Sequence, residues 1–565
     1  MSASSSDLSS VKYGYDFVVA TTQASINATM KLFLSGLTEP EVTVCYIADD
    51  QGKPVEIDYD QLKKLANGSD PFAVAATADP TTDPDLRNLI NARFMMGFRA
   101  QIGLPPGIAP DKVPDIVTLG SDTSSVVYNL LCSEFTVVEL NPGGGYSPPT
   151  WLSQSQPPGS PWVFTSKVDL RLSAVDQSAY SRLPVPVQQQ IKRLGPGAFS
   201  VQQLLFDLDN AALETTPAIS GVTPGTTLYM VLEQSFLGAY FAQQKKNGEP
   251  LLGCVIQQSG APTSTLTVTD LDMEVSPFLD GNGRTIVDPT PDQRNLATLS
   301  YLCAADGDPL PVAVPFGWNW IEAAEETDCD GVVAINRATL ANYFRNRLAG
   351  YVATNCYRPS VSVTYDWGSA QTNYAWNMAR GQNPTVTTPA TGPTVLTFHY
   401  DADAADQAGL NGDLGQLELH PSYDVTVTFS GNTITVVQHL VIYLRVQSLA
   451  TSTSGNVVNV TVTDTYTLAV AQDGRLAATL STNRQDTSQN PAVDPFLNFW
   501  TEVNTIISAV EGWLRNVTST NLQDIPVSVV QNFVFPGGRT FAFKSAQFSD
   551  FGDLVSHITY TDPTS

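Results

Sequence analysis

The residues that could act in acid–base or metal chemistry are few and widely spaced in this chain of 565 residues. Its four histidines are His399, His420, His439 and His557, and three of them lie in or beside one stretch of alternating residues. A zinc site needs His or Cys at close, regular spacing, and the chain lacks such spacing. We therefore expect each histidine to be a surface or strand residue, and we predict no metal site and no cofactor.

A faint calcium-loop pattern runs from Leu279 to Arg284. An EF-hand requires an oxygen donor at its fifth position and a bidentate Glu at its twelfth. Counted from Asp280, these positions hold Arg284 and Pro291. The Asp-Gly and Asn-Gly pairs predict a hairpin turn instead.

Motifs of nucleophilic catalysis and phosphate binding are also missing. The chain contains no G-x-S-x-G, no H-E-x-x-H and no P-loop. The glycines at 143–145 precede Tyr146 and two prolines rather than a Lys and a helix start, so residues 141–161 are expected to be a Pro/Gly-rich loop. Two carboxylates could still meet in space, because the acids of a glycosidase need not be close in sequence.

Charge and composition narrow the classes of partner. The net charge of −26, from 29 Lys and Arg against 55 Asp and Glu, repels nucleic acids and anionic lipid head groups. The N-terminus shows no basic and apolar leader, and no run of about 18 apolar residues occurs, so we expect no signal peptide and no transmembrane segment. These features predict an acidic, cytoplasmic protein with reduced cysteines, and leave leaderless release open.

Two amphipathic helices carry the residues that we expect to face a ligand. The first follows the strand-like residues 15–20 and has apolar residues at spacings of three and four. The second begins at Pro495, which suits the first helical position, and runs to about Val517 with one wide apolar stripe. The predicted cavity-lining residues are Ile26, Met30, Phe33 and Leu34 of the first helix, and Phe499, Val503, Ile507, Val510 and Leu514 of the second. The same residues would equally line a filled core.

Other segments predict more helices and a large sheet. Helical periodicity is present at 226–246 and again at 336–352, where the residues expected on the buried side are Leu340, Tyr343, Phe344, Leu348, Tyr351 and Val352. From Leu396 to Val470, apolar residues alternate with polar ones, and Ser430–Asn432 and Asp473–Gly474 mark turns. This pattern predicts an antiparallel meander with one buried and one solvated face.

Four segments resemble the clostridial neurotoxin-cluster accessory proteins, the OrfX group and its forty-seven-kilodalton relative. They are residues 13–19 (YGYDFVV), 199–208 (FSVQQLLFDL), 315–320 (PFGWNW) and 330–337 (DGVVAINR), which occur in the family's order. The resemblance implies the fold of the tubular lipid-binding (TULIP-like) superfamily: a β-rich α+β chain in which long amphipathic helices are cradled by strongly curved antiparallel sheets, in two related modules. It also implies lipid binding or assembly with sister proteins of one gene cluster, and it transfers no catalytic residue.

We therefore predict three parts: a disordered tail at 1–12, a first TULIP-like module at 13–325 with the Pro/Gly-rich insertion near 141–161, and a second β-rich module at 326–565 with the long helix 495–517. The predicted function is non-enzymatic binding of a lipid or another apolar ligand in a tubular cavity, without nucleic acid. The alternative is a scaffold or accessory subunit of a multiprotein, toxin-associated complex with a filled core. A carboxylate-dependent hydrolase is the third hypothesis.

Overall fold

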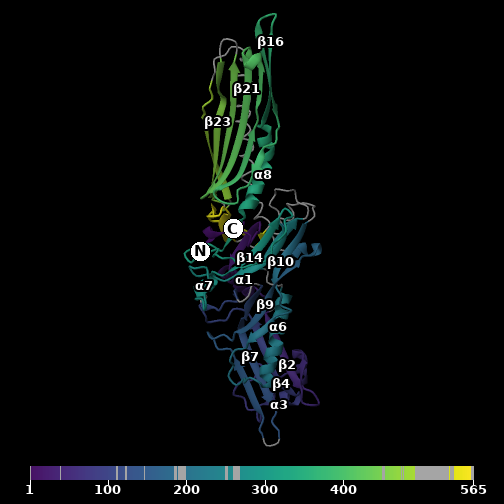
Figure 1. Ribbon diagram of the computed structural model, residues 1–565. Coiled ribbons are helices and arrows are strands. Elements are labelled where there is room, and N and C mark those ends of the chain that lie inside the picture. The colour runs from purple at the N-terminus through teal and green to yellow at the C-terminus, as the bar shows by residue number, and fades with distance from the viewer. Residues whose placement is uncertain are drawn as a thin grey trace.

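The computed structural model spans residues 1–565 and describes all of them except 1, 39, 110–111, 121–123, 145–146, 183–187, 189–198, 248–251, 259–267, 448–451, 473, 475, 490–532, 535–539 and 562–565. The described chain is an elongated rod, with one sheet of long strands at one end, a central sheet near both termini, and two further sheets towards the other end (Figure 1). The predicted helix at 495–517 lies outside the described residues, together with Phe499, Val503, Ile507, Val510 and Leu514.

The central sheet is built around β1 (Phe17–Thr22), in which all six residues are buried. β1 pairs antiparallel with β14 (Thr298–Ala305) on one side and β15 (Gly331–Ile335) on the other. The remaining strands are β13 (Val268–Ser276), β28 (Leu554–Thr561), β26 (Thr540–Phe543) and β27 (Gln547–Phe548). The sheet thus takes strands from both predicted modules, and the limits at 13–325 and 326–565 stay predictions.

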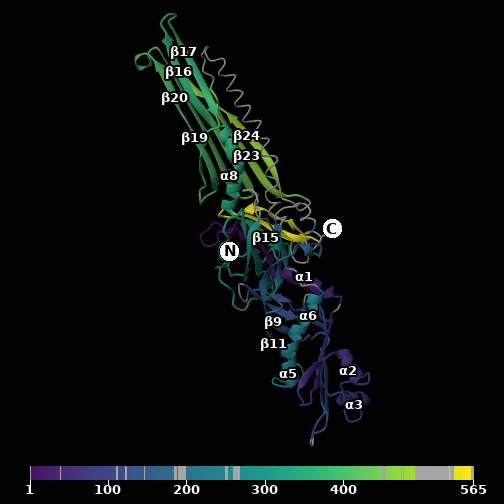
Figure 2. The same cartoon turned by 90° about the vertical axis from the view of Figure 1, so that its right-hand side faces the viewer.

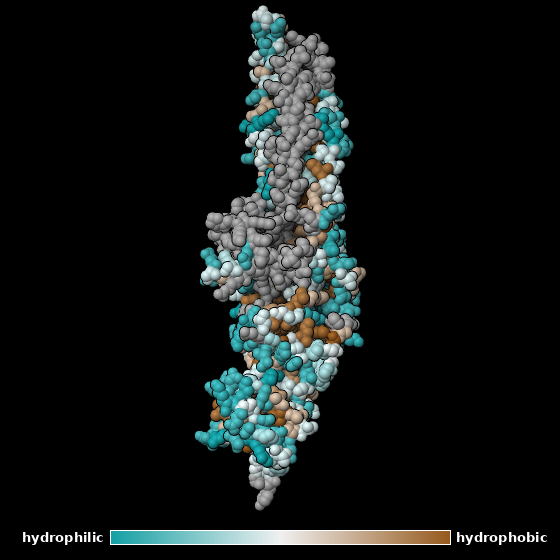
Figure 3. Space-filling view, turned by 180° about the vertical axis from the view of Figure 1, so that it is seen from behind, coloured by the Kyte–Doolittle hydropathy of each residue, from teal (hydrophilic) through white to brown (hydrophobic). Residues whose placement is uncertain are grey.

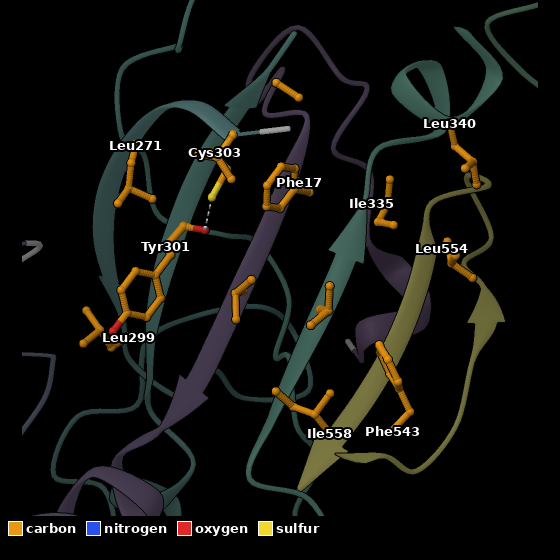
Figure 4. Close-up of a cluster of buried hydrophobic side chains, with 14 of the residues drawn as sticks. Phe17, Leu271, Leu299, Tyr301, Cys303, Ile335, Leu340, Phe543, Leu554 and Ile558 are labelled. Atoms are coloured by element: carbon orange, nitrogen blue, oxygen red, sulfur yellow. Dashed lines mark hydrogen bonds between the residues drawn. The ribbon is translucent and has the colours of Figure 1, made fainter. Parts of the chain in front are cut away.

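One face of the central sheet is a continuous apolar layer. Phe17 is opposite Cys303 on β14 and Ile335 on β15, so the three side chains share a face. Figure 4 shows them beside Tyr301 and Ile558, and all five are at most 2% exposed. This layer joins the sheet to the main core.

β1 and β15 each lead directly into a helix. α1 (Gln23–Ser35) follows β1 and is capped by Thr22, and α8 (Arg337–Thr354) follows β15 and is capped by Asn336. Because the two strands are antiparallel, the helices leave the central sheet towards opposite ends of the rod, as Figures 1 and 2 show. The capping residues agree with the general preference for Thr and Asn at helix N-termini.

The two strand–helix units are fastened by matching aspartates. Asp16, before β1, accepts hydrogen bonds from the Thr339 hydroxyl of α8 and from the Ala305 amide at 2.7 Å. Asp330, before β15, accepts from the Ser25 hydroxyl of α1 at 2.7 Å and from the amide of Tyr560 at 2.7 Å. Asp16 thus joins α8 to β14, and Asp330 joins α1 to β28.

The long-strand sheet confirms the predicted meander. Its strands follow the order β18 (Thr385–Thr387), β19 (Thr394–Asp401), β21 (Gly415–Ser430), β22 (Thr433–Gln447), β23 (Ser452–Val470) and β24 (Leu476–Asp486), and β20 (Ala404–Ala408) pairs with β21. The hairpin β16 (Tyr357–Asp366) and β17 (Gln371–Arg380) lies against β20 and β21. In β21 and β22, buried residues alternate with half-buried ones, as expected for a sheet with one solvated face.

The other half of the rod contains two antiparallel sheets. One has the order β5 (Val117–Thr118), β6 (Ser125–Leu130), β9 (Phe164–Ala174), β10 (Phe199–Phe206), β12 (Gly253–Gln258) and β25 (Phe533–Val534), with β11 (Ala212–Thr215) on β9. The second has the order β3 (Pro54–Ile57), β2 (Glu41–Ala48), β4 (Phe94–Ile102), β7 (Cys132–Asn141) and β8 (Thr150–Ser155). Its short helices are α2 (Tyr59–Leu65) and α3 (Pro84–Asn91), and α7 (Pro291–Asn295) lies near α1.

A helix at 227–246 fills the interior of this half. It consists of α5 (Thr227–Val231), a π-helical turn at Leu232–Phe236 and α6 (Leu237–Lys246), where the sequence predicts one regular helix. The Phe236 ring centroid is 4.4 Å from that of Phe164 and 4.8 Å from that of Phe135. Interlocked aromatic rings therefore fill this part of the core.

Two predictions about loops are wrong. The expected disordered tail is packed: Leu8 is fully buried, and its amide donates to Asp553 Oδ2 at 2.7 Å. A serine of this segment also bonds to the core, since Ser6 Oγ donates to the same oxygen at 2.8 Å. In the expected loop at 141–161, residues 150–155 instead form β8, because they pair with β7.

The described surface varies along the rod. Seen from behind, hydrophobic residues gather near the middle, and the end that carries α2 and α3 is mostly hydrophilic (Figure 3). Among the helices that the structure describes, none is long and apolar enough to cross a bilayer.

Candidate ligand-binding site

The inner face of the long-strand sheet is an apolar wall, which we call the inner wall. Its strands project every second side chain towards α8, and these side chains are at most 6% exposed. The apolar members are Leu417, Leu419, Tyr423, Val425, Val427 and Phe429 of β21, Ile434, Val436, Leu440, Ile442, Leu444 and Val446 of β22, and Val458, Val460, Val462, Tyr466 and Leu468 of β23.

α8 lies along this wall with the face that its sequence predicts. Its buried apolar residues include Leu340, Tyr343, Phe344, Leu348, Tyr351 and Val352. The Phe344 ring centroid is 5.8 Å from that of Phe429. With 18 residues, α8 is about 27 Å long, whereas the 16 residues of β21 extend about 54 Å. By itself α8 therefore lines about half of the wall.

A polar group interrupts the wall near its middle. Gln438 occupies an inward position of β22 and is only 2% exposed. Its Oε1 accepts hydrogen bonds from the Tyr351 hydroxyl at 3.0 Å and the Tyr423 hydroxyl at 2.6 Å. Burial raises the pKa of both tyrosines, so their hydroxyls stay protonated and donate. Gln438 thereby fastens α8 to the sheet.

Some polar atoms of this region are buried without a hydrogen-bond partner. They are Gln438 Nε2, Asp464 Oδ2 and the Tyr357 hydroxyl. Asp464 is 2% exposed, and its other oxygen accepts a hydrogen bond from the Thr482 hydroxyl at 2.5 Å. Burial raises the pKa of Asp464, and the Thr482 hydrogen bond opposes this shift. An unsatisfied buried polar atom lowers the stability of the fold by about 1–3 kcal/mol, so a hydrogen-bond partner for these atoms would stabilise the protein.

Gln438 and Asp464 are diagonal neighbours on the inner wall. Gln438 pairs with Val462 across β22 and β23, and Asp464 pairs with Val436 two residues along. The side chains of such a diagonal pair lie on the same face at a Cα separation of roughly 7–8 Å. An amide donor and a carboxylate acceptor thus share one patch of an otherwise apolar surface.

A cleft lies elsewhere on the described chain, away from the inner wall. It is a cleft of about 290 Å³ lined by Phe278, Leu279, Asp280, Gly281, Ile286, Gln293, Asn319 and Glu322. Asp280 Oδ1 accepts hydrogen bonds from the amides of Asn282 and Arg284 at 2.8 and 2.9 Å, which is the turn that the sequence predicts. The Asn319 amide is occupied by the backbone of Leu279. Asp280 and Asn319 therefore hold the loops of this cleft in place.

The histidines lie away from the inner wall. His399, His420 and His439 are on the half-buried or exposed face of the long-strand sheet, and His557 is on β28. In the part of the chain that the structure describes, no three His, Cys, Asp or Glu side chains form a group that could hold a metal ion. The pKa of Cys45 is raised to about 12 by burial, so this thiol is unreactive at neutral pH.

The predicted cavity-lining residues of α1 lie elsewhere in the core. Ile26, Met30 and Leu34 are at most 2% exposed, and Phe33 is half-buried. α1 is fastened to β5 by Asn27, whose Oδ1 accepts from the Val117 amide at 2.8 Å. The structure does not bring these residues to the inner wall, and their role in a cavity stays a prediction.

Sequence reasoning missed Gln438 and Asp464. Both stand at inward positions of strands with a regular alternation, between apolar residues two positions away on either side. A polar residue at such a position is the signal that could have found them.

Comparisons with known proteins give only remote similarities. No protein-family profile and no curated protein matches the chain. The crystal structure of P47 of Clostridium botulinum E1 aligns over 97% of this chain and 100% of its own, with 7% identity and a TM-score of 0.42. The crystal structure of a lipopolysaccharide binding protein aligns over 97% and 99%, with 12% identity and a TM-score of 0.30. At these scores neither structure identifies the family or the function of this chain.

Proposed function

We propose that this chain is a non-enzymatic binding protein that holds a lipid or another apolar ligand along the inner wall. The observation that carries the proposal is an apolar wall on strands of 15–19 residues with hydrogen-bonding atoms left unpaired near its middle. Ligand sites typically combine a mostly apolar lining with a few placed polar groups. Each methylene moved from water onto such a wall gains about 0.8 kcal/mol, so a long acyl chain gives useful affinity.

We further infer that the chain consists of two related TULIP-like modules that share the central sheet. The matching units β1–α1 and β15–α8 support this inference, as do the matching bonds of Asp16 and Asp330. In such an arrangement each module presents one helix to its own sheet. The inner wall belongs to the second module.

Native mass spectrometry and probe uptake test the binding function. The full chain, purified without harsh detergent, is expected to carry a lipid that survives gentle ionisation, or to take up cis-parinaric acid with a rise in fluorescence. Absence of both a co-purified lipid and probe uptake would contradict the proposal.

A matched pair of variants tests whether the ligand binds on the inner wall. Val462→Phe adds bulk on the inner wall beside Gln438, whereas Thr461→Phe adds the same ring to the opposite face of β23. We expect Val462→Phe to reduce probe uptake at least tenfold and Thr461→Phe to leave it unchanged, with circular dichroism confirming that both fold. Equal probe uptake by both variants would show that the ligand does not bind on the inner wall.

The alternative is a scaffold or accessory subunit with a filled core. The ring packing around Phe236 favours it, because that interior is closed by aromatic side chains. This alternative predicts no probe uptake by the purified chain and a stable complex with a sister protein. Turnover of an ester or glycan substrate would instead favour a hydrolase.

A further inference from the structure

The unpaired atoms of the inner wall define the head group of the ligand. We propose that Gln438 and Asp464 bind an uncharged hydroxyl or amide group of an amphiphile, as in a monoacylglycerol or a ceramide, rather than a phosphate or carboxylate. This inference rests on the proposed function and adds the chemical class of the ligand.

The two ends of the Gln438 amide face different surroundings. Two phenol hydroxyls, those of Tyr351 and Tyr423, converge on Oε1 at 3.0 and 2.6 Å. The structure thus places the amide oxygen on the side of the phenols, which can donate to it. The Nε2 group, which can donate two hydrogen bonds, therefore faces the unpaired side of the site.

Asp464 supplies the complementary acceptor. Thr482 donates to Oδ1, and Oδ2 is left buried without a partner. Oδ2 and Gln438 Nε2 are on the same face of adjacent strands but do not bond each other. A group placed between them satisfies both when it accepts from the amide and donates to the carboxylate, which a hydroxyl or a secondary amide does.

An acidic head group fits the site less well than an uncharged one. An ionised Asp464 would repel a phosphate or carboxylate. An acidic head group would also leave Oδ2 without a donor. A bound water could bridge the same atoms, because a water needs two to four polar partners, and the experiment must separate the water from the ligand.

Competition among three oleoyl compounds tests the head-group specificity. Monooleoylglycerol, methyl oleate and oleate share the same acyl chain and displace a fluorescent apolar probe, the methyl ester of cis-parinaric acid. For the native chain we expect monooleoylglycerol to bind at least tenfold more tightly than methyl oleate, and oleate to bind no better than methyl oleate. Tenfold is the effect of about one added hydrogen bond.

Variants of Gln438 and Asp464 test whether these two residues cause the preference for monooleoylglycerol over methyl oleate. Gln438→Leu and Asp464→Leu are expected to reduce the ratio between monooleoylglycerol and methyl oleate to near one. Thr463→Val, on the opposite face of β23, should keep the native ratio. Asp464→Asn serves if the leucine variant does not fold, and it should lower the ratio less.

The outcomes separate the two proposals. If no compound displaces the probe because no probe binds, the proposed function fails. If all three compounds bind alike in the native chain and in the variants, the head-group inference is overturned while the binding function stands.

Discussion

At the scale of single residues, Arg337 joins distant parts of the chain through backbone carbonyls. Its guanidinium donates to the carbonyl oxygens of Gly392, Phe551, Pro389 and Thr394, and it is only 4% exposed. A planar guanidinium can serve several acceptors in fixed directions, whereas an ammonium has three donors on one atom. Arg337 therefore holds two loops onto the first turn of α8.

Replacing Arg337 with Lys should destabilise the fold by about 2–4 kcal/mol, because buried carbonyls lose their donors. Guanidinium chloride unfolding measures the change. Arg345→Lys is the control, since Arg345 is exposed on the same helix, and it should shift stability by less than about 0.5 kcal/mol. Similar losses for both variants would contradict the role of Arg337.

Glu274 is a buried carboxyl that should make stability depend on pH. It is fully buried, and desolvation raises its pKa to about 8, opposed by a hydrogen bond from Ser276 and by Lys12. Because the pKa of Glu274 is higher in the native state than in the unfolded chain, protonation of this carboxyl stabilises the native state. Its contribution is therefore complete below about pH 4.5 and is lost as the pH rises through 8.

The free energy of unfolding should thus decrease by on the order of 4 kcal/mol between pH 5 and pH 9 through this group. Glu274→Gln should flatten the decrease, because the amide does not titrate. Unfolding by guanidinium chloride at pH 5, 7 and 9, in the native chain and the variant, measures the difference. Parallel pH profiles would show that Glu274 is not ionising within the native core.

The contacts of single residues were the hardest feature to predict from the sequence. Helical spacing predicts Leu340, Phe344 and Tyr351 on the buried face of α8, where the structure has them, because this spacing depends only on neighbours in the chain. It does not reveal that Gln438 meets Tyr351, since that contact forms between residues far apart in sequence. Long-range polar contacts depend on topology, which local patterns do not encode.

At the scale of elements, the helices that sequence places best are those with local end signals. α1 begins after Thr22 and ends at Gly36, as its cap residues indicate. The helix at 227–246 is recovered except for its π-helical turn at Leu232–Phe236, which the periodicity does not indicate. β8 was missed for a related reason, because a short strand among prolines is recognisable only through its partner β7.

The two aspartate bridges allow a test of the matching units. Asp16→Asn and Asp330→Asn each replace a carboxylate oxygen, which accepts, with an amide NH₂, which only donates. We expect each to destabilise the chain by about 1–3 kcal/mol. Because the two sites do not share a partner, their effects should add in the double variant within about 0.5 kcal/mol.

Urea unfolding of the two single variants and the double variant measures these terms. Asp366→Asn is a suitable control, since Asp366 caps an exposed turn at the tip of the β16–β17 hairpin. A large loss for Asp16→Asn beside none for Asp330→Asn would mean that the two units are not equivalent in energy.

At the scale of the whole molecule, the two ends of the chain meet at the central sheet. β28, near the C-terminus, pairs with β15, and residues 2–8 pack on the loop that precedes β28. Sequence patterns identified the long-strand meander but not this arrangement, because pairing between segments hundreds of residues apart leaves no local signal. The N-terminal segment is therefore a structural part of the sheet region.

This arrangement predicts that a change near the N-terminus weakens the C-terminal strand. Leu8 is fully buried and lies beside Asp553, whose two oxygens accept from the amides of Leu8 and Arg337 and whose pKa is raised by burial to about 6. Leu8→Ala should cost about 2–5 kcal/mol, and hydrogen exchange should accelerate in β28. Val11→Ala is the matched control, because Val11 is fully exposed. If the amides of β28 exchange at the same rate in both variants, the N-terminal segment does not stabilise this strand. If exchange in β28 is faster only in Leu8→Ala, the N-terminal segment stabilises β28 directly.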